Sequence, residues 1–140
     1  MIDSKYINNI FLVDDDKIFN LIHTKTIQKA RMTVNVHSFC RADEAIENIK
    51  QTVGGNSQVF PNLIFLDINM PVMDGWEFLD EYKKLQSIDS AKQCKVIMIS
   101  SSIDPNDIEK SKEYKSVYDF VSKPLTNDKI DKIFSSLETS

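Results

Sequence analysis

Residues 63–75 have the sequence Leu-Ile-Phe-Leu-Asp-Ile-Asn-Met-Pro-Val-Met-Asp-Gly. Four consecutive apolar residues end abruptly at Asp67, and turn-forming residues flank them on both sides. A short, continuous apolar run between turn signals predicts a buried β-strand. Asp67 therefore stands where a strand leaves the sheet. In open α/β sheets the carboxyl ends of the strands border the ligand crevice, so we expect the Asp67 carboxylate to be within reach of a ligand.

Five such strand-like segments alternate with five segments that have helical periodicity. The strands are expected at 10–13, 34–39, 63–67, 96–99 and 117–121, and the helices over about 17–32, over 42–53, and from residues 75, 105 and about 127. Strands that alternate with helices predict a parallel sheet that is covered by helices on both faces.

The expected helices differ in how much apolar surface they can bury. The first is assigned a broad apolar stripe made of Ile18, Phe19, Leu21, Ile22 and Ala30. Ile27 falls outside that stripe. The helix from Pro105 has one aliphatic residue, Ile108, before Tyr114, so we expect it to be weakly held. The second helix is expected to stop at 54–57 (Gly-Gly-Asn-Ser), and residues 52–62 are interpreted as a surface insertion.

Composition restricts the function classes. The 140 residues, 41% hydrophobic and 27% charged, are those of one soluble globular domain. The net charge of −4 and the lack of a basic patch argue against nucleic-acid binding by this chain alone. No apolar run approaches the length of about 18 residues that a membrane span needs, and no signal peptide is evident. We therefore expect a cytoplasmic protein without membrane contact, whose Cys40 and Cys94 are reduced thiols.

Four of the five expected strands end in polar residues that can do chemistry. The first runs into Asp14-Asp15-Asp16, the third ends at Asp67, the fourth at Ser100 and the fifth is followed by Ser122-Lys123-Pro124. Carboxyl ends of parallel strands share one edge of a sheet. Three carboxylates in one crevice cannot all stay ionised without a cation, and hard oxygen ligands suit Mg²⁺.

A lysine and a hydroxyl beside a metal-bound carboxylate can bind a phosphoryl group, because the cations neutralise its oxygens. Asp67, the central acid, is then the natural nucleophile for an acyl phosphate. Taken singly, the acidic triplet is more typical of a solvated helix start, Lys123 of a surface lysine and Ser100 of a turn. Only their convergence favours a site, and Asp16 is interpreted as an ordinary helix-start acid.

Together these motifs resemble those of the response-regulator receiver domains of two-component signalling, over about residues 8–137. The resemblance implies an α/β fold of the flavodoxin-like, doubly wound kind. It has a five-stranded parallel sheet in the order 2-1-3-4-5 and five helices, in three layers. It further implies that residues 1–140 form a single receiver domain with no output domain.

The resemblance also implies a role for individual residues. Asp67 is similar to the phosphoaccepting aspartate, Asp15 to the direct Mg²⁺ ligand and Asp14 to the acid that reaches the metal through water. Asn69 stands at the position whose backbone carbonyl is the third protein ligand. Gly75 matches a loop glycine that is needed where a side chain would clash.

Three further positions carry the catalytic and switch roles of the family. Lys123 matches the phosphate-binding lysine, and the Lys123–Pro124 peptide bond is expected to be cis. Ser100 stands where threonine is commoner and keeps the hydroxyl. The switch pairs that hydroxyl with an aromatic residue, here Phe120, which lacks the hydroxyl of the tyrosine that is also common there.

The function implied is that of a stand-alone response regulator. A histidine kinase or a histidine phosphotransfer protein would donate a phosphoryl group to Asp67, and a partner-binding face would then switch for an unknown target. On this interpretation the chain catalyses only its own phosphorylation and dephosphorylation. The alternatives are a phosphorelay intermediate, or a receiver-like docking module that is never phosphorylated. A phosphohydrolase is disfavoured because Asn69 occupies the place of its general acid.

Overall fold

The computed structural model describes residues 7–53, 60–88 and 94–139, so residues 54–59 of the insertion predicted over 52–62 lie outside the described residues. Five strands alternate with five helices. The strands are β1 (Asn9–Val13), β2 (Asn35–Phe39), β3 (Leu63–Asp67), β4 (Lys95–Ser100) and β5 (Val117–Ser122). The helices are α1 (Lys17–Ala30), α2 (Ala42–Val53), α3 (Gly75–Ile88), α4 (Pro105–Ser111) and α5 (Asn127–Thr139). The predicted segments are confirmed, with boundaries that move by two residues or fewer.

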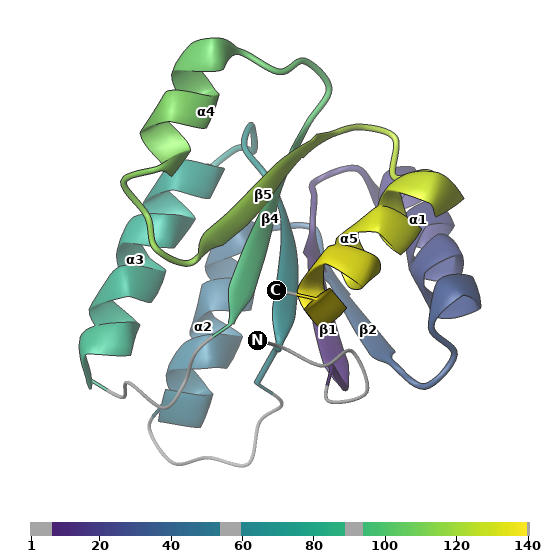
Figure 1. Cartoon of the computed structure of the whole chain (residues 1–140). Coiled ribbons are helices and arrows are strands. Elements are labelled where there is room, and N and C mark those ends of the chain that lie inside the picture. The colour runs from purple at the N-terminus through teal and green to yellow at the C-terminus, as the bar shows by residue number, and fades with distance from the viewer. Residues whose placement is uncertain (1–6, 54–59, 89–93, 140) are drawn as a thin grey trace.

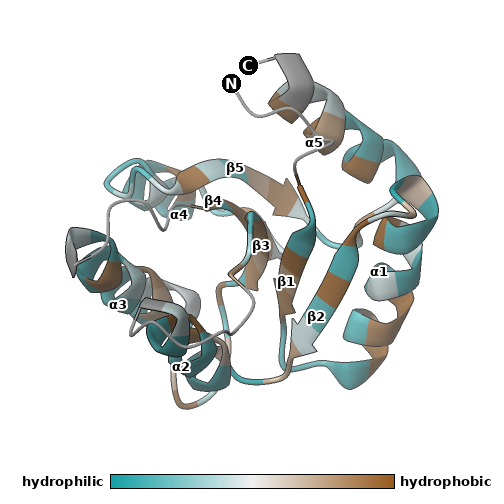
Figure 2. Ribbon diagram, turned by 90° about the horizontal axis from the view of Figure 1, so that it is seen from below, coloured by the Kyte–Doolittle hydropathy of each residue, from teal (hydrophilic) through white to brown (hydrophobic). Residues whose placement is uncertain are grey.

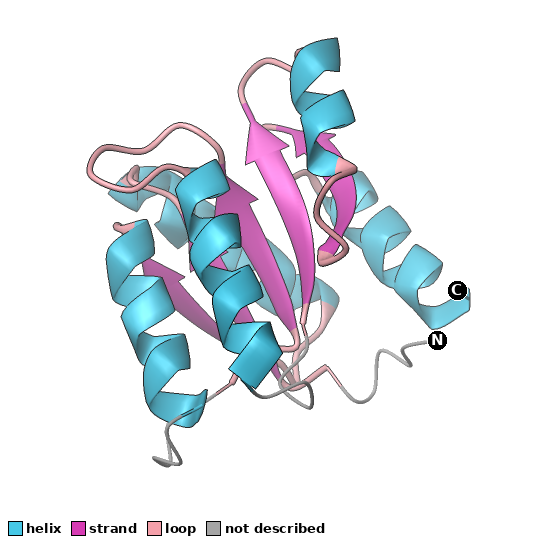
Figure 3. Cartoon of the chain, turned by 90° about the vertical axis from the view of Figure 1, so that its left-hand side faces the viewer, coloured by secondary structure: helices cyan, strands magenta, loops and turns pink. Residues whose placement is uncertain are grey.

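The strands form one parallel sheet in the order β2-β1-β3-β4-β5, which confirms the predicted topology. Helices α1 and α5 cover one face of the sheet, and α2, α3 and α4 lie on the other side (Figure 1). The sheet between two helical layers gives the three layers that the sequence implied (Figure 3). The chain order reverses between β1 and β3, so the crevice of the fold lies at their carboxyl ends.

Each face of the sheet has its own apolar core. Alternate residues of a strand point to opposite faces, and β3 is buried at all five positions. Its Ile64 and Leu66 pack with α2 and α3, whereas Leu63 and Phe65 pack with α1 and α5. On α5 the hydrophobic residues accordingly lie on the side that faces the sheet (Figure 2). A central strand buried on both faces fixes the position of Asp67 at its end.

Helices α2 and α5 each bury one apolar face. The buried apolar residues of α2 are Ala42, Ala45, Ile46 and Ile49, and those of α5 are Ile130, Ile133, Phe134 and Leu137. Both sets follow the i, i+3, i+4, i+7 spacing of an amphipathic helix. Within the described residues, no helix is both long enough and apolar enough to span a membrane.

The predicted apolar stripe of α1 is wrong for three of its five residues, whereas Phe19 and Ala30 pack against the core. Ile18, Leu21 and Ile22 are exposed by 70%, 59% and 54%, whereas Ile27, which was placed outside the stripe, is fully buried. The face of α1 toward the sheet instead carries two buried polar residues. These residues are Asn20 and His23. Asn20 Nδ2 donates to the Asp14 carbonyl at 2.8 Å, and His23 Nδ1 lies 2.7 Å from the Phe19 carbonyl. Polar groups with such partners can be buried at low cost, and hydropathy does not reveal them.

Helix α4 is attached to the rest of the domain by few buried groups, and Ser111 is its one buried residue. Side chains link it to α3. Lys110 Nζ lies 4.8 Å above the Trp76 ring, the Tyr114 ring stacks on that same indole, and the Tyr114 hydroxyl donates to Asp80 at 2.8 Å. These are contacts at the surface, and weak attachment of α4 stays a prediction for hydrogen exchange to test.

Candidate functional site

The acidic residues predicted to form the site lie at the carboxyl ends of neighbouring strands. Asp14 follows β1 and is fully buried, and Asp67 ends β3 with 4% of its surface exposed. Asp15 is exposed beside them. Carboxylate oxygens of these three residues all lie within 4.8 Å of one another. The structure therefore brings together the three acids that the sequence singled out.

Lys123 completes this cluster from the other side of the crevice. Its Nζ lies 2.6 Å from Asp14 Oδ2 and 3.3 Å from Asp67 Oδ2. Lys123 follows β5, and its backbone N–H donates to the Ser100 carbonyl at 2.8 Å, so the end of β4 holds it in place. One ammonium group thus bridges two buried carboxylates.

Backbone hydrogen bonds fix the two buried acids. Asp14 Oδ1 accepts the Asp16 N–H at 2.9 Å, and the Asp14 N–H donates to the Phe39 carbonyl at the end of β2. Asp16 is the N-cap of α1, which fits its interpretation as a helix-start acid. Asp67 Oδ1 receives the Asn69 N–H at 3.4 Å, a long contact that leaves this oxygen open to another partner.

The charges of the cluster perturb one another. Burial, and then the charge of Asp14, raise the pKa of Asp67 to about 6, while Lys123 opposes this change. Desolvation lowers the pKa of Lys123, but its hydrogen bond to Asp14 and the charges of both aspartates outweigh that effect and leave the pKa raised. At neutral pH Asp67 is therefore mostly ionised, which destabilises the folded state, and it lies next to a protonated lysine.

The residues fit a divalent cation. Three carboxylates supply hard oxygen ligands, and within the described residues the buried Asp14 Oδ2 has no partner besides the Lys123 ammonium, 2.6 Å away. Mg²⁺ prefers such oxygens, binds through one or two carboxylates and keeps several waters. The exposed Asp15 is the acid through which a hydrated ion can enter. Asn69, the predicted carbonyl ligand, is exposed in the loop beside Asp67.

Two predicted structural positions border the acids. The Gly75 N–H donates to the Ile68 carbonyl at 2.8 Å, and a Cβ on Gly75 would lie 2.9 Å from the Asp67 carbonyl oxygen. That contact with backbone explains the glycine. The Lys123–Pro124 peptide bond is cis, as the resemblance implies. Between β3 and α3, Val72 has φ of 70°, an unfavourable conformation for a β-branched residue.

Ser100 and Phe120, the predicted switch pair, lie on neighbouring strands. Ser100 is 2% exposed, and its hydroxyl donates to the Ser102 carbonyl at 2.7 Å. Phe120 is half-buried against the core on the α3 side and pairs in register with Met98 of β4. In this structure the hydroxyl is thus engaged by its own loop, and turning it toward Asp67 requires that bond to break.

Sequence reasoning missed one group that borders the site. The Phe19 ring, near the start of α1, has Lys123 Nζ 4.6 Å from its centroid. The same ring stacks on His23 with centroids 3.7 Å apart. Phe19 was placed in an apolar stripe, and hydropathy gives no signal of its contact with Lys123.

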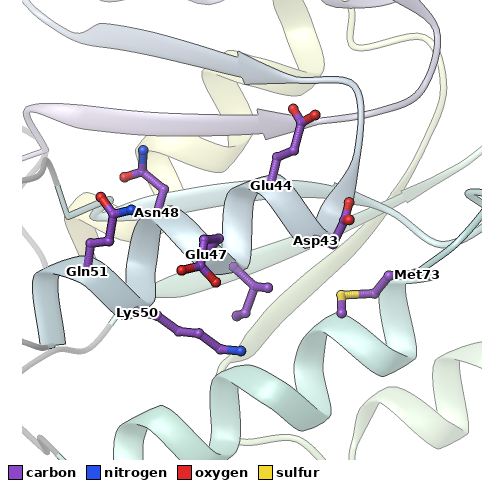
Figure 4. A pocket seen from close by; sticks show the side chains of 8 residues that line it. Asp43, Glu44, Glu47, Asn48, Lys50, Gln51 and Met73 are labelled. Atoms are coloured by element: carbon purple, nitrogen blue, oxygen red, sulfur yellow. The ribbon is translucent and has the colours of Figure 1, made fainter.

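A hollow of about 490 Å³ lies elsewhere, on α2 and the loop before α3 (Figure 4). Asp43, Glu47, Lys50 and Met73 contribute to its lining. It contains none of the predicted site residues. The hollow is therefore separate from the crevice at the strand ends.

Comparison with known proteins gives one family model, described as "Response regulator receiver domain", which matches residues 10–135. A two-component response regulator from Cytophaga hutchinsonii has a similar solved structure. Its TM-score is 0.80, its sequence identity is 30%, and the match covers 96% of this chain and 98% of that one.

Two curated proteins have related sequences. The C4-dicarboxylate transport transcriptional regulatory protein DctD of Rhizobium meliloti is 29% identical over 123 residues, which are 87% of this chain and 23% of that protein. The hybrid signal transduction histidine kinase L of Dictyostelium discoideum is 28% identical over 130 residues, 93% of this chain and 7% of that protein. The chain thus spans less than a quarter of the length of either.

Proposed function

The chain belongs to the response regulator receiver family, and from that premise we propose that it accepts a phosphoryl group onto Asp67 in a Mg²⁺-dependent reaction. The observation that supports this most is the bridge of Lys123 Nζ between Asp14 and Asp67, with the Asp15 carboxylate alongside. A buried nucleophilic carboxylate, a fixed ammonium and two further acids are the parts that phosphoryl transfer to an aspartate needs.

In the proposed reaction an Asp67 oxygen attacks the phosphorus atom of a phosphohistidine in line with the departing nitrogen. A P–O bond forms and the P–N bond breaks, and the imidazole leaves with the electron pair. Asp14, Asp15, Asp67 and the Asn69 carbonyl would hold Mg²⁺, which when bound supplies positive charge to the phosphoryl oxygens. Lys123 supplies a second positive charge from a fixed position.

The switch follows from the charge that is added at Asp67. A phosphoryl group brings about −1.5 to −2 charges and strong acceptor oxygens. The Ser100 hydroxyl would leave the Ser102 carbonyl and donate to the new oxygens, and Phe120 would turn into the space that is vacated. Helix α4, linked to α3 through Lys110 and Trp76, would then repack and alter the face it forms with β5 and α5.

The direct test uses a small phosphodonor. Incubation with acetyl phosphate and Mg²⁺ should add one phosphoryl group, as measured by intact mass. Chelation of the metal should prevent the addition. A protein that gains no phosphoryl group, and whose spectra do not respond to beryllofluoride, would instead be the docking module. Turnover of small phosphomonoesters would favour the phosphohydrolase, although Asn69 lacks the acid that such an enzyme needs.

We also propose where a protein donor docks. Ile18, Leu21 and Ile22 form an exposed apolar stripe on α1, the helix that begins directly after Asp14 and Asp15. A protein whose phosphohistidine reaches Asp67 must come close to that helix. Three large aliphatic side chains in water are costly unless a partner covers them. A helical partner with a complementary apolar groove, as a histidine kinase or phosphotransfer protein, would do so.

Replacing Leu21 or Ile22 by Ser should slow phosphotransfer from any histidine kinase that phosphorylates the wild-type chain by about tenfold, because contacts in the centre of an interface carry its binding energy. Labelling by acetyl phosphate should not change, since that donor needs no docking surface. Met32→Ser, at a site 87% exposed beyond the end of α1, is the matched control. Equal losses with both donors would show that the stripe acts on folding and not on docking.

A receiver domain that is phosphorylated on Asp67 can act either as a phosphorelay intermediate or as a terminal regulator. A phosphorelay intermediate would pass the phosphoryl group on to a histidine of a second protein, whereas a terminal regulator would keep it until hydrolysis. Incubating the labelled protein with candidate phosphotransfer proteins separates the two by where the label is found.

A further inference from the structure

An aromatic pair on α1 lies against the ammonium group of the site. The Phe19 ring is half-buried, and Lys123 Nζ lies 4.6 Å from its centroid. A cation at this distance from an aromatic ring lies within the range of a cation–π attraction. The His23 ring stacks on the same phenyl group at 3.7 Å with an interplanar angle of 24°.

Hydrogen bonds to the backbone of Phe19 position both aromatic residues. The Phe19 N–H donates to the N-cap carboxylate of Asp16 at 3.1 Å. The Phe19 carbonyl accepts from His23 Nδ1 at 2.7 Å, which places a proton on that nitrogen. His23 is 4% exposed, so core packing limits its motion. The buried His23 ring therefore limits where the stacked phenyl ring can move.

Lys123 has two kinds of anchor, and they differ in what can displace them. Asp14 and Asp67 hold the ammonium at 2.6 and 3.3 Å. Both carboxylates are also the groups that a cation and an incoming phosphoryl group would engage. The face of the phenyl ring has no such competitor. When the acids take up their ligands, the ring is the contact that can stay.

We propose that Phe19, fixed by His23, is a positioning residue that keeps the Lys123 ammonium directed at Asp67 while the carboxylates bind the metal and the phosphoryl group. The inference rests on the proposed function for its kinetic consequence. The ring itself touches no reacting atom. Its contribution is to limit where the four-carbon side chain of Lys123 can place its charge.

The test compares three variants. Phe19→Leu removes the ring and keeps an apolar side chain, and Phe19→Tyr keeps the ring. Tyr118→Leu is the control, because it removes a similar contact remote from the acids, where Lys95 Nζ lies 5.0 Å from the Tyr118 ring. Phe19→Leu should slow labelling by acetyl phosphate about three- to tenfold, the loss expected for one such contact. Phe19→Tyr and Tyr118→Leu should stay within about twofold of the wild type.

A second measurement does not depend on phosphorylation. In NMR spectra of the wild type, the ring should shift the Hε protons of Lys123 upfield, and the shift should persist when Mg²⁺ and then beryllofluoride are added. In Phe19→Leu the shift should be absent. Loss of the upfield shift on adding Mg²⁺ to the wild type would show that the ammonium leaves the ring, which would overturn the proposal.

The outcomes separate this inference from the proposed function. If Phe19→Leu is labelled as fast as the wild type, while Lys123→Ala is not labelled, the ring is a bystander and phosphorylation at Asp67 stands. If the wild type is not labelled at all, the proposed function fails, and the NMR shifts in the wild type alone decide whether the ring anchors Lys123. If Phe19→Leu does not fold, those same wild-type spectra decide the question.

Discussion

Replacing Asp67 by Asn should leave a folded protein that takes up no phosphoryl group from acetyl phosphate in the presence of Mg²⁺. An amide oxygen lacks the charge and the lone-pair reactivity of a carboxylate, so the nucleophile is removed while the shape of the side chain is retained. Loss of a nucleophile typically costs several orders of magnitude, and we expect the initial rate of labelling to fall at least about a thousandfold.

The surroundings of Asp67 make this substitution mild for the fold. Lys123 keeps its ion pair with Asp14 at 2.6 Å, so the ammonium is not left alone. Asp67 accepts one backbone hydrogen bond, from Asn69 at 3.4 Å, which an amide oxygen can also accept. Unaltered circular dichroism and Trp76 fluorescence should accompany the lost labelling.

The control for this variant is an acid of the same type away from the crevice. Asp128 is exposed in the first turn of α5, and Asp128→Asn should be labelled like the wild type. Undiminished labelling of Asp67→Asn would identify another acceptor. Peptide mapping would then have to decide between Asp14 and Asp15, the two other acids of the cluster.

The fold was predictable because its central strands are buried on both faces and therefore appear in the sequence as continuous apolar runs. All five residues of β3 are buried, and each of its neighbours β1 and β4 contains a similar apolar run. A sequence of this kind allows little besides a central parallel strand. The end of each run then fixes which side chain leaves the sheet, which is why Asp14, Asp67 and Lys123 could be assigned to one crevice.

The orientation of α1 could not be predicted from the same kind of pattern. Its face toward the sheet includes Asn20 and His23, which are buried because backbone carbonyls of Asp14 and Phe19 lie within hydrogen-bonding distance. Those carbonyls come from the loop and the helix itself, so their positions are known only after folding. Ile18 and Leu21 are exposed as a result. Hydropathy alone therefore assigned exposed residues to the buried face, although Phe19 and Ala30 do pack against the core.

The contact of Phe19 with Lys123 lies beyond sequence reasoning for a related reason. It joins residues 104 positions apart, through the packing of α1 beside the loop after β5. The bond of the Ser100 hydroxyl to the Ser102 carbonyl is likewise a property of one loop conformation. Motifs predict which residues meet, but they do not predict which of several possible partners each polar atom selects.

Without Mg²⁺, the free energy of unfolding of the wild type should fall as the pH rises from about 4 to about 7, relative to that of Asp67→Asn. The pKa of Asp67 is about 6 in the folded protein, above its usual value of 3.8. Within this window the folded state therefore holds a proton that the unfolded chain has released. Stability from this group is complete below about pH 4 and is lost as the pH passes about 6.

The size of the effect follows from the shift. About two pH units correspond to about 3 kcal/mol, which is an upper value for what the ionised Asp67 costs the fold at pH 8. Urea unfolding of both proteins at several pH values, with a chelator present, measures the difference between them. The difference isolates Asp67 because other titrating groups are common to both. Parallel pH profiles would show that the pKa of Asp67 is not raised.

Mg²⁺ should offset this loss of stability at high pH. A cation that binds the folded acids and not the unfolded chain stabilises the fold, by about 2.7 kcal/mol at a hundred times its Kd. The wild type at pH 8 should gain this stabilisation in full, whereas Asp67→Asn, which has lost one ligand, should gain less. Burial of Asp67, and then its repulsion from Asp14, raise the pKa of Asp67, and both unfavourable effects are relieved when a cation binds. A site that is least stable when empty and ionised is the one in which metal binding and phosphoryl transfer have the most electrostatic energy to recover.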